Sequence, residues 1–125
     1  MENVFDSGKL RISCAVMGML GNNVYLLESD GAKAIVDPSC KADEICELAG
    51  GTDISQILIT HYHFDHTGAA NALRNMTGAK TYASAVDAKN IEAGSEDPFP
   101  YRRVEPCPVD VRLREGDTVE VGQTT

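Results

Sequence analysis

The sequence lacks a long apolar run, a Cys-x-x-Cys pair and an excess of basic residues, and each absence excludes a class of protein. No apolar stretch approaches the roughly 20 residues that a membrane-spanning helix needs. No two of the four cysteines form a Cys-x-x-Cys pair, and no disulfide framework is indicated. Lysine and arginine number 11 against 19 aspartates and glutamates, for a net charge of −8. That charge argues against nucleic acid and against an anionic membrane surface as partners.

The first residues, Met1 to Asp6, contain no basic segment followed by an apolar run, so no signal peptide is expected. Reduced thiols and a cytoplasmic location follow as expectations. With 125 residues, of which 42% are hydrophobic and 24% charged, the composition is typical of a soluble globular protein. We expect one domain over residues 1–125, because no repeat or long linker divides the chain.

Histidine is absent from the whole chain except in one run of six residues, His61 to His66, which holds three histidines and Asp65. Imidazole nitrogen and carboxylate oxygen are ligands that zinc, iron and manganese accept. One histidine would suit a polar surface loop, but three within six residues favour a metal site. A structural zinc site with a cysteine as fourth ligand is a second alternative, although no cysteine lies near the run in sequence.

Short apolar runs separated by turn residues predict a mixed α/β layer fold. Strands are expected at residues 10–17, 24–28, 32–37, 54–60, 80–83, 109–113 and 118–121. Helices are expected at residues 41–48, 69–76 and 85–93, and Thr67 could cap the second of these or contact substrate. A loop is expected at residues 94–108.

The strand expected at 54–60 leads directly into His61, and this order predicts a metal centre at the tip of the strand. Alternate side chains of an extended segment point the same way, so His61 and His63 can reach one metal. Asp65 and His66 can reach a second ion that lies about 3.5–4 Å from the first ion. Asp37, at the end of an earlier strand, is a candidate to orient a ligating histidine. The alternative for Asp37 is a turn-forming residue before Pro38.

Residues 60–68, Thr-His-Tyr-His-Phe-Asp-His-Thr-Gly, resemble the signature of the metallo-β-lactamase superfamily, the His-x-His-x-Asp-His metallohydrolases. Residues 23–27, 34–38 and 113–117 are similar to flanking segments of that family. The resemblance implies the amino-terminal half of a four-layer αββα sandwich. It also implies hydrolysis of small-molecule thioesters, lactams, lactones, phosphodiesters or sulfate esters, mostly on two zinc ions, with iron or manganese in some members.

The same resemblance assigns His61 and His63 to the first metal, and Asp65 and His66 to the second, with Asp65 also a catalytic residue. In the family, two later histidines and an aspartate complete the site, and no histidine follows His66 here. Two functions therefore stay open. One is a metallohydrolase acting as a complete domain. The other is a non-catalytic half-domain that binds metal or assembles, as a homo-oligomer or with a complementing C-terminal half. Redox di-iron relatives usually carry Glu in place of His63, which favours the hydrolase branch.

Overall fold

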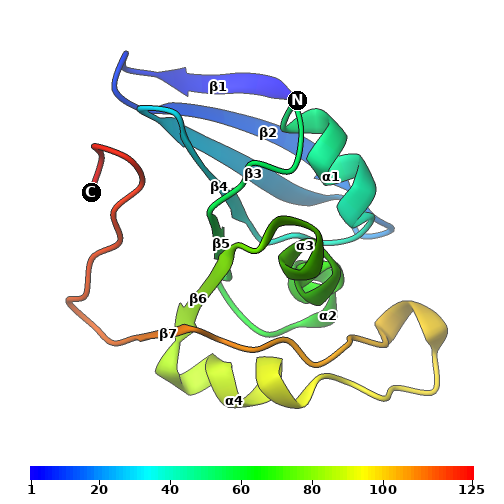
Figure 1. Ribbon diagram of the computed structural model, residues 1–125. Coiled ribbons are helices and arrows are strands. Elements are labelled where there is room, and N and C mark those ends of the chain that lie inside the picture. Colours follow the sequence, from blue (N-terminus) through cyan, green and yellow to red (C-terminus); the bar gives the residue numbers. More distant parts are fainter.

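Seven strands form one sheet whose spatial order is the order of the chain, in a computed structural model that describes residues 1–125 (Figure 1). The strands are β1 (Glu2–Asp6), β2 (Arg11–Met17), β3 (Asn22–Ser29), β4 (Ala32–Val36), β5 (Gln56–Leu58), β6 (Lys80–Ser84) and β7 (Val111–Leu113). The pairs from β1 to β4 are antiparallel, and those from β4 to β7 are parallel. The mixed α/β class is therefore confirmed.

The antiparallel half is a meander of short hairpins. Along β3, buried Val24 and Leu26 alternate with more exposed side chains, as expected for a strand with one face on the core. Ser29 pairs with Ala32, so Asp30 and Gly31 alone make the turn to β4. Both turn residues have positive φ, 49° and 79°, as a two-residue type I′ turn requires.

The parallel half needs crossovers, and helices supply them. The helices are α1 (Ala42–Leu48) after β4, α2 (Phe64–Thr67) and α3 (Ala70–Thr77) after β5, and α4 (Ala85–Ala93) after β6, followed by the 3-10 turn η1 (Pro100–Arg102). None of these helices has both the length and the apolar character needed to cross a membrane.

One cluster of 20 buried residues joins the sheet to α1, α3 and α4. Its centre contains Ile35 of β4, Ile57 of β5, Ile45 of α1 and Leu73 of α3, each with a relative exposure of 0%. Burial of such side chains gives about 1.5–3 kcal/mol each, so this core holds β4 and β5 rigidly in place. The loops at the ends of these two strands are therefore presented on a fixed base.

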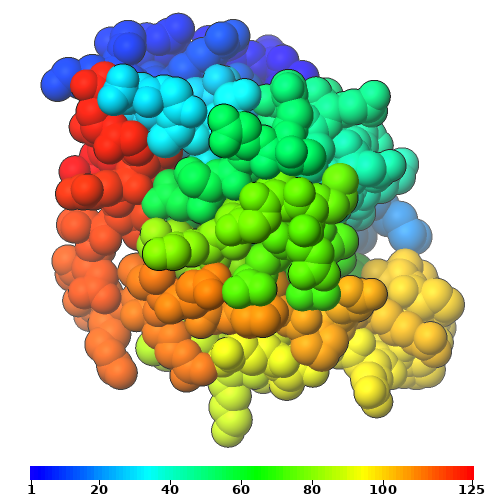
Figure 2. All heavy atoms as spheres, viewed as in Figure 1, coloured from blue at the N-terminus to red at the C-terminus, as the bar shows by residue number.

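The C-terminal residues pack beside the sheet, where Figure 2 shows them along one side of the molecule. The Gln56 side chain donates to the carbonyl of Glu120 over 2.8 Å. The hydroxyls of Ser29 and Thr124 lie 2.8 Å apart. Hydrogen bonds to single side chains, and not strand pairing, attach this segment to the sheet.

Three expectations about the elements are corrected, and one strand was missed. The strand expected at 118–121 is wrong, because Val121 makes only an isolated bridge to Thr124. The strand expected at 54–60 is confined to Gln56–Leu58. β1 was not expected, and its five residues are all exposed. Thr67 does not cap the helix that follows, since it ends α2 and is 1% exposed.

Candidate metal centre

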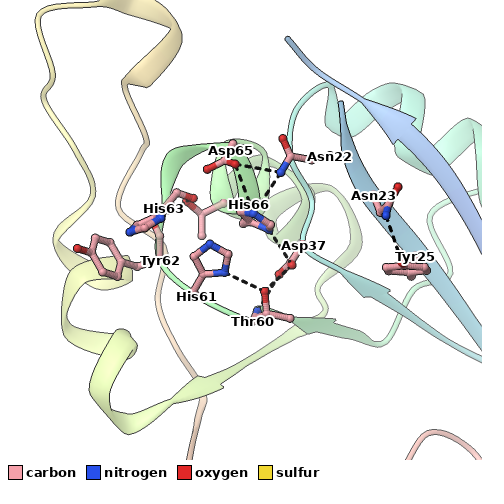
Figure 3. A network of polar contacts seen from close by, with 11 residues as sticks. Asn22, Asn23, Tyr25, Asp37, Thr60, His61, Tyr62, His63, Asp65 and His66 are labelled. Atoms are coloured by element: carbon pink, nitrogen blue, oxygen red, sulfur yellow. Dashed lines mark hydrogen bonds and ion pairs between the residues drawn. The ribbon is translucent and has the colours of Figure 1, made fainter. Parts of the chain in front are cut away.

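The candidate site lies where β4 and β5 end, because the carboxyl ends of neighbouring parallel strands meet at one edge of a sheet. Asp37 follows β4, and residues 60–66 follow β5. The amide of Asp37 donates to the carbonyl of Leu58 over 2.9 Å, which extends the pairing of the two strands by one bond. Figure 3 shows the side chains that converge there.

Asp37 binds three donors from residues 60–66 and is only 5% exposed. Its Oδ1 accepts from the backbone amide of Thr60 at 2.7 Å, and its Oδ2 accepts from the Thr60 hydroxyl at 2.5 Å. Oδ2 also lies 2.9 Å from Nδ1 of His66. A carboxylate accepts only, so Nδ1 of His66 carries the proton and Nε2 keeps its lone pair. This is the tautomer in which Nε2 can bind a metal.

Asn22, the first residue of β3, faces the other side of His66. Its Nδ2 lies 3.0 Å from Oδ2 of Asp65 and 3.1 Å from Nε2 of His66. Asn22 lies outside the strands expected at residues 10–17 and 24–28 and was assigned no role. The contact joins residues 43 and 44 positions apart, so only the folded β2–β3 hairpin reveals it.

A single helical turn arranges the motif. His63 precedes α2, and Asp65 and His66 lie within its first turn. The buried hydroxyl of Thr67 donates to the carbonyls of Tyr62, at 3.2 Å, and His63, at 3.0 Å. These bonds fix the backbone of the motif, which explains the burial of Thr67.

The three imidazoles lie near one another. The ring centroid of His61 is 3.9 Å from that of His66 and 4.8 Å from that of His63. Nδ1 of His61 lies 3.1 Å from the Thr60 hydroxyl, so Thr60 contacts both Asp37 and a histidine of the motif. His63 is the most exposed of the three rings.

The charge state of Asp65 is set by opposing influences. Partial burial raises its pKa, but the hydrogen bond from Asn22, a backbone hydrogen bond and the neighbouring imidazoles of His66 and His61 outweigh burial. The pKa of Asp65 therefore lies below its ordinary value. An ionised carboxylate is the form that binds a cation.

The donor set fits a transition metal in part. No group of three histidine, cysteine, aspartate or glutamate side chains is arranged to hold a metal ion. Nε2 of His66 and Oδ2 of Asp65, however, lie 3.4 Å apart. Two ligands bound tetrahedrally at 2.0–2.2 Å are separated by about 3.4 Å, so this pair already has the spacing for one ion. The structure brings Asp37, Asp65 and His66 together, with His61 beside them, and leaves His63 at the rim.

Two cavities adjoin the motif. One of about 380 Å³ is lined by His63 and Asp65 together with residues of α4 and of the loop that follows it. The other, of about 630 Å³, is lined by Asn22 and Asp65 together with Met19 and Leu20 of the β2–β3 turn. The guanidinium of Arg102 stacks over the Phe64 ring at 5.8 Å, beside the first cavity. A small molecule thus has access to Asp65 from two sides.

The sequence profile of the Metallo-beta-lactamase superfamily matches residues 17–125. The chain belongs to this family. The match includes the whole motif and both strands that position it, so the resemblance found in the sequence is confirmed.

A hydroxyacylglutathione hydrolase of Jannaschia sp. (strain CCS1) is 34% identical over 104 residues, which span 81% of this chain and 35% of the relative. BJP-1, a subclass B3 metallo-beta-lactamase of Bradyrhizobium japonicum, has a similar structure, with a TM-score of 0.78 and 26% identity over 98% of this chain and 49% of that one. A di-iron-bound form of TTHA1623 gives a TM-score of 0.72 and 26% identity over 86% and 56% of the two chains. The chain thus spans 35% to 56% of the length of these relatives, and it has the fold of their amino-terminal half.

Proposed function

We propose that this chain carries one half of the metal centre of a hydrolase that cleaves an ester, thioester, lactone or lactam bond of a small molecule. The observation that carries the proposal is the series of side-chain contacts from Asp37 to His66 and from His66 to Asp65. One carboxylate fixes the tautomer of an imidazole whose free nitrogen lies 3.4 Å from a second carboxylate. Hydrogen bonding of this kind to a ligand histidine is typical of metal enzymes.

The bound ions would lower the pKa of a water to about 7 and polarise the scissile acyl group. Each residue of this chain has a distinct part. His61 and His63 would present imidazole nitrogens to the first ion. Asp65 and His66 would hold the second, with Asp65 also orienting the attacking water. Asp37 would keep Nε2 of His66 deprotonated.

The relatives support the choice of bond and the presence of a metal centre. One is named a hydroxyacylglutathione hydrolase and another a metallo-beta-lactamase, and both names describe cleavage of an acyl bond. Zinc is the expected metal, and iron is the alternative because TTHA1623 is described with two iron atoms. Since this chain spans under two thirds of these relatives, we propose that a second half supplies the remaining ligands. A cytoplasmic location stays a prediction from the sequence.

The test combines metal analysis with a screen of acyl substrates on the intact natural polypeptide that carries this sequence. We expect two ions per chain and turnover of a thioester, lactone or lactam that is abolished by a chelator. Asp65→Asn should remove the second ion and the turnover, while Asp53→Asn, the same change at an exposed position, should leave both unchanged. Weak binding of one ion, oligomers and no turnover would instead support the half-domain that only binds metal or assembles.

A further inference from the structure

Asn22 occupies the point on which two of the proposed ligand atoms converge (Figure 3). Oδ2 of Asp65 can only accept hydrogen bonds. Nε2 of His66 must also accept, because Nδ1 of the same ring faces Asp37. The amide nitrogen of Asn22 has two hydrogens, and one is available for each acceptor. The nitrogen therefore satisfies both lone pairs.

A cation would require the same two lone pairs. The hydrogens of Asn22 Nδ2 carry partial positive charge, so they suit these acceptors as a metal ion would, and they would repel an ion bound there. Asn22 cannot keep this orientation once Asp65 and His66 hold a metal.

The other end of the amide indicates what replaces this orientation. Oδ1 of Asn22 is buried and has no hydrogen-bond partner, which holds for only one other side-chain atom of the chain, Nε of Arg74. Buried polar atoms are nearly always paired, so an orphaned acceptor next to candidate ligands calls for a partner. A half rotation about χ2 would exchange Oδ1 and Nδ2 without moving the backbone, and this torsion has a broad, two-fold preference.

We propose that Asn22 is an additional residue of the second metal position. Its amide nitrogen holds Asp65 and His66 in place while the site is empty, and its amide oxygen turns to the ion when one binds. This inference rests on the proposed function, because it requires a metal at Asp65 and His66. Amide oxygen is a known ligand of hard cations and an acceptor for water bound to softer ones.

The test measures zinc affinity in the intact natural polypeptide by competition with a chromogenic chelator. Asn22→Ala should weaken the second ion by about 10–100-fold and leave the first unchanged. Asn22→Asp keeps the oxygen and lacks the NH2 group, so it should bind the second ion at least as tightly as the wild type. Asn23→Ala is the matched control, because Asn23 is exposed and donates to the Tyr25 hydroxyl, away from the site. It should match the wild type.

A purely structural role gives a different pattern. If the NH2 group alone mattered, Asn22→Asp would bind zinc as weakly as Asn22→Ala or more weakly, and this result would overturn the proposal. In the wild type, the side-chain amide signals of Asn22 should shift on adding the second equivalent of zinc, and unshifted signals would count against the proposal. If Asn22→Ala and Asn23→Ala bound both ions equally well, the role of Asn22 would be refuted and the proposed function would stand. A wild-type protein that binds no zinc would overturn the proposed function as well.

Discussion

Replacement of Asp37 by asparagine tests the central interaction of the site with minimal disturbance of the backbone. Asp37 has φ 52°, in the left-handed region. Asparagine tolerates this region better than most residues, so Asp37→Asn changes the hydrogen bonding and leaves the turn intact. Alanine at the same position would add backbone strain and obscure the result.

The hydrogen bonds of Asp37 determine how much unfolding free energy Asp37→Asn loses. The carboxylate accepts from Thr60 N, Thr60 Oγ1 and His66 Nδ1. An amide offers one acceptor oxygen, so in either orientation its NH2 group faces a donor. When the NH2 group faces Thr60 N, the buried backbone amide of Thr60 is left unpaired. When the NH2 group faces His66, Nδ1 must become an acceptor and the proton moves to Nε2. Losing one hydrogen bond to a charged acceptor costs about 1.5–3 kcal/mol of unfolding free energy.

The effect on metal binding follows from the tautomer. A protonated Nε2 cannot bind an ion, and loss of such a supporting carboxylate typically lowers metal affinity by about 10–100-fold. Urea unfolding gives the first quantity, and zinc competition in the intact natural polypeptide gives the second. Nitrogen NMR of His66 reports the tautomer directly. Asp53→Asn, an exposed control, should change none of these measurements. Unaltered zinc affinity together with an unaltered His66 tautomer in Asp37→Asn would refute the reasoning.

The remaining predictions concern stability and thiol reactivity. Gly68→Ala should destabilise by at least about 1–3 kcal/mol in urea unfolding, because its Cβ would lie too close to the Ser39 carbonyl oxygen. Asp110→Ala should lower the free energy of unfolding by about 1–3 kcal/mol at neutral pH, measured in the same way. Hydrogen bonds from a backbone amide and from arginine hold the pKa of Asp110 below its ordinary value. The cost should therefore persist above about pH 5 and shrink as the pH falls below about 4. Cys107 should react with a thiol reagent more slowly than Cys40, because burial raises the pKa of the Cys107 thiol.

The sequence predicted well those features that depend on local chemistry. The helix expected at 85–93 is α4 with the same bounds, because Ser84 caps it by accepting from the amide of Asp87. The turn at Asp30 and Gly31 follows from the need for two positive φ angles. The candidate metal-ligating run could be recognised because side-chain packing alone seldom requires three histidines in six residues.

Features that depend on distant contacts could not be read from the sequence. Thr118 to Val121 alternates as a strand does, yet it joins no strand of the sheet, and Val121 makes only an isolated bridge to Thr124. β1 has no buried face and forms through backbone pairing with the edge of β2. Asn22 follows Gly21 in a segment typical of a turn, and its contact with Asp65 exists only after the sheet has formed.

The glycine at the end of the motif has a physical reason that joins the fold to the site. Gly68 has φ −54° and ψ −33°, which any residue can adopt, so its conformation does not require glycine. The space around it does, because the backbone of Ser39 lies against it. The amide of Ala69 donates to the carbonyl of Pro38 over 2.9 Å at the same place. This close approach presses the segment after β4 onto the turn between α2 and α3, and Asp37 lies at the start of that segment.

A side chain at position 68 would push the two segments apart and lengthen the bond between Asp37 and His66. Gly68→Ala should therefore weaken zinc binding as well as the fold. The matched control is Gly78→Ala, where a Cβ meets no atom within 4 Å and only the positive φ is strained. That variant should lose some stability and keep the zinc affinity of the wild type, because Gly78 closes α3 away from the site. Equal zinc affinities in the two variants would show that the contact at Gly68 serves the fold alone.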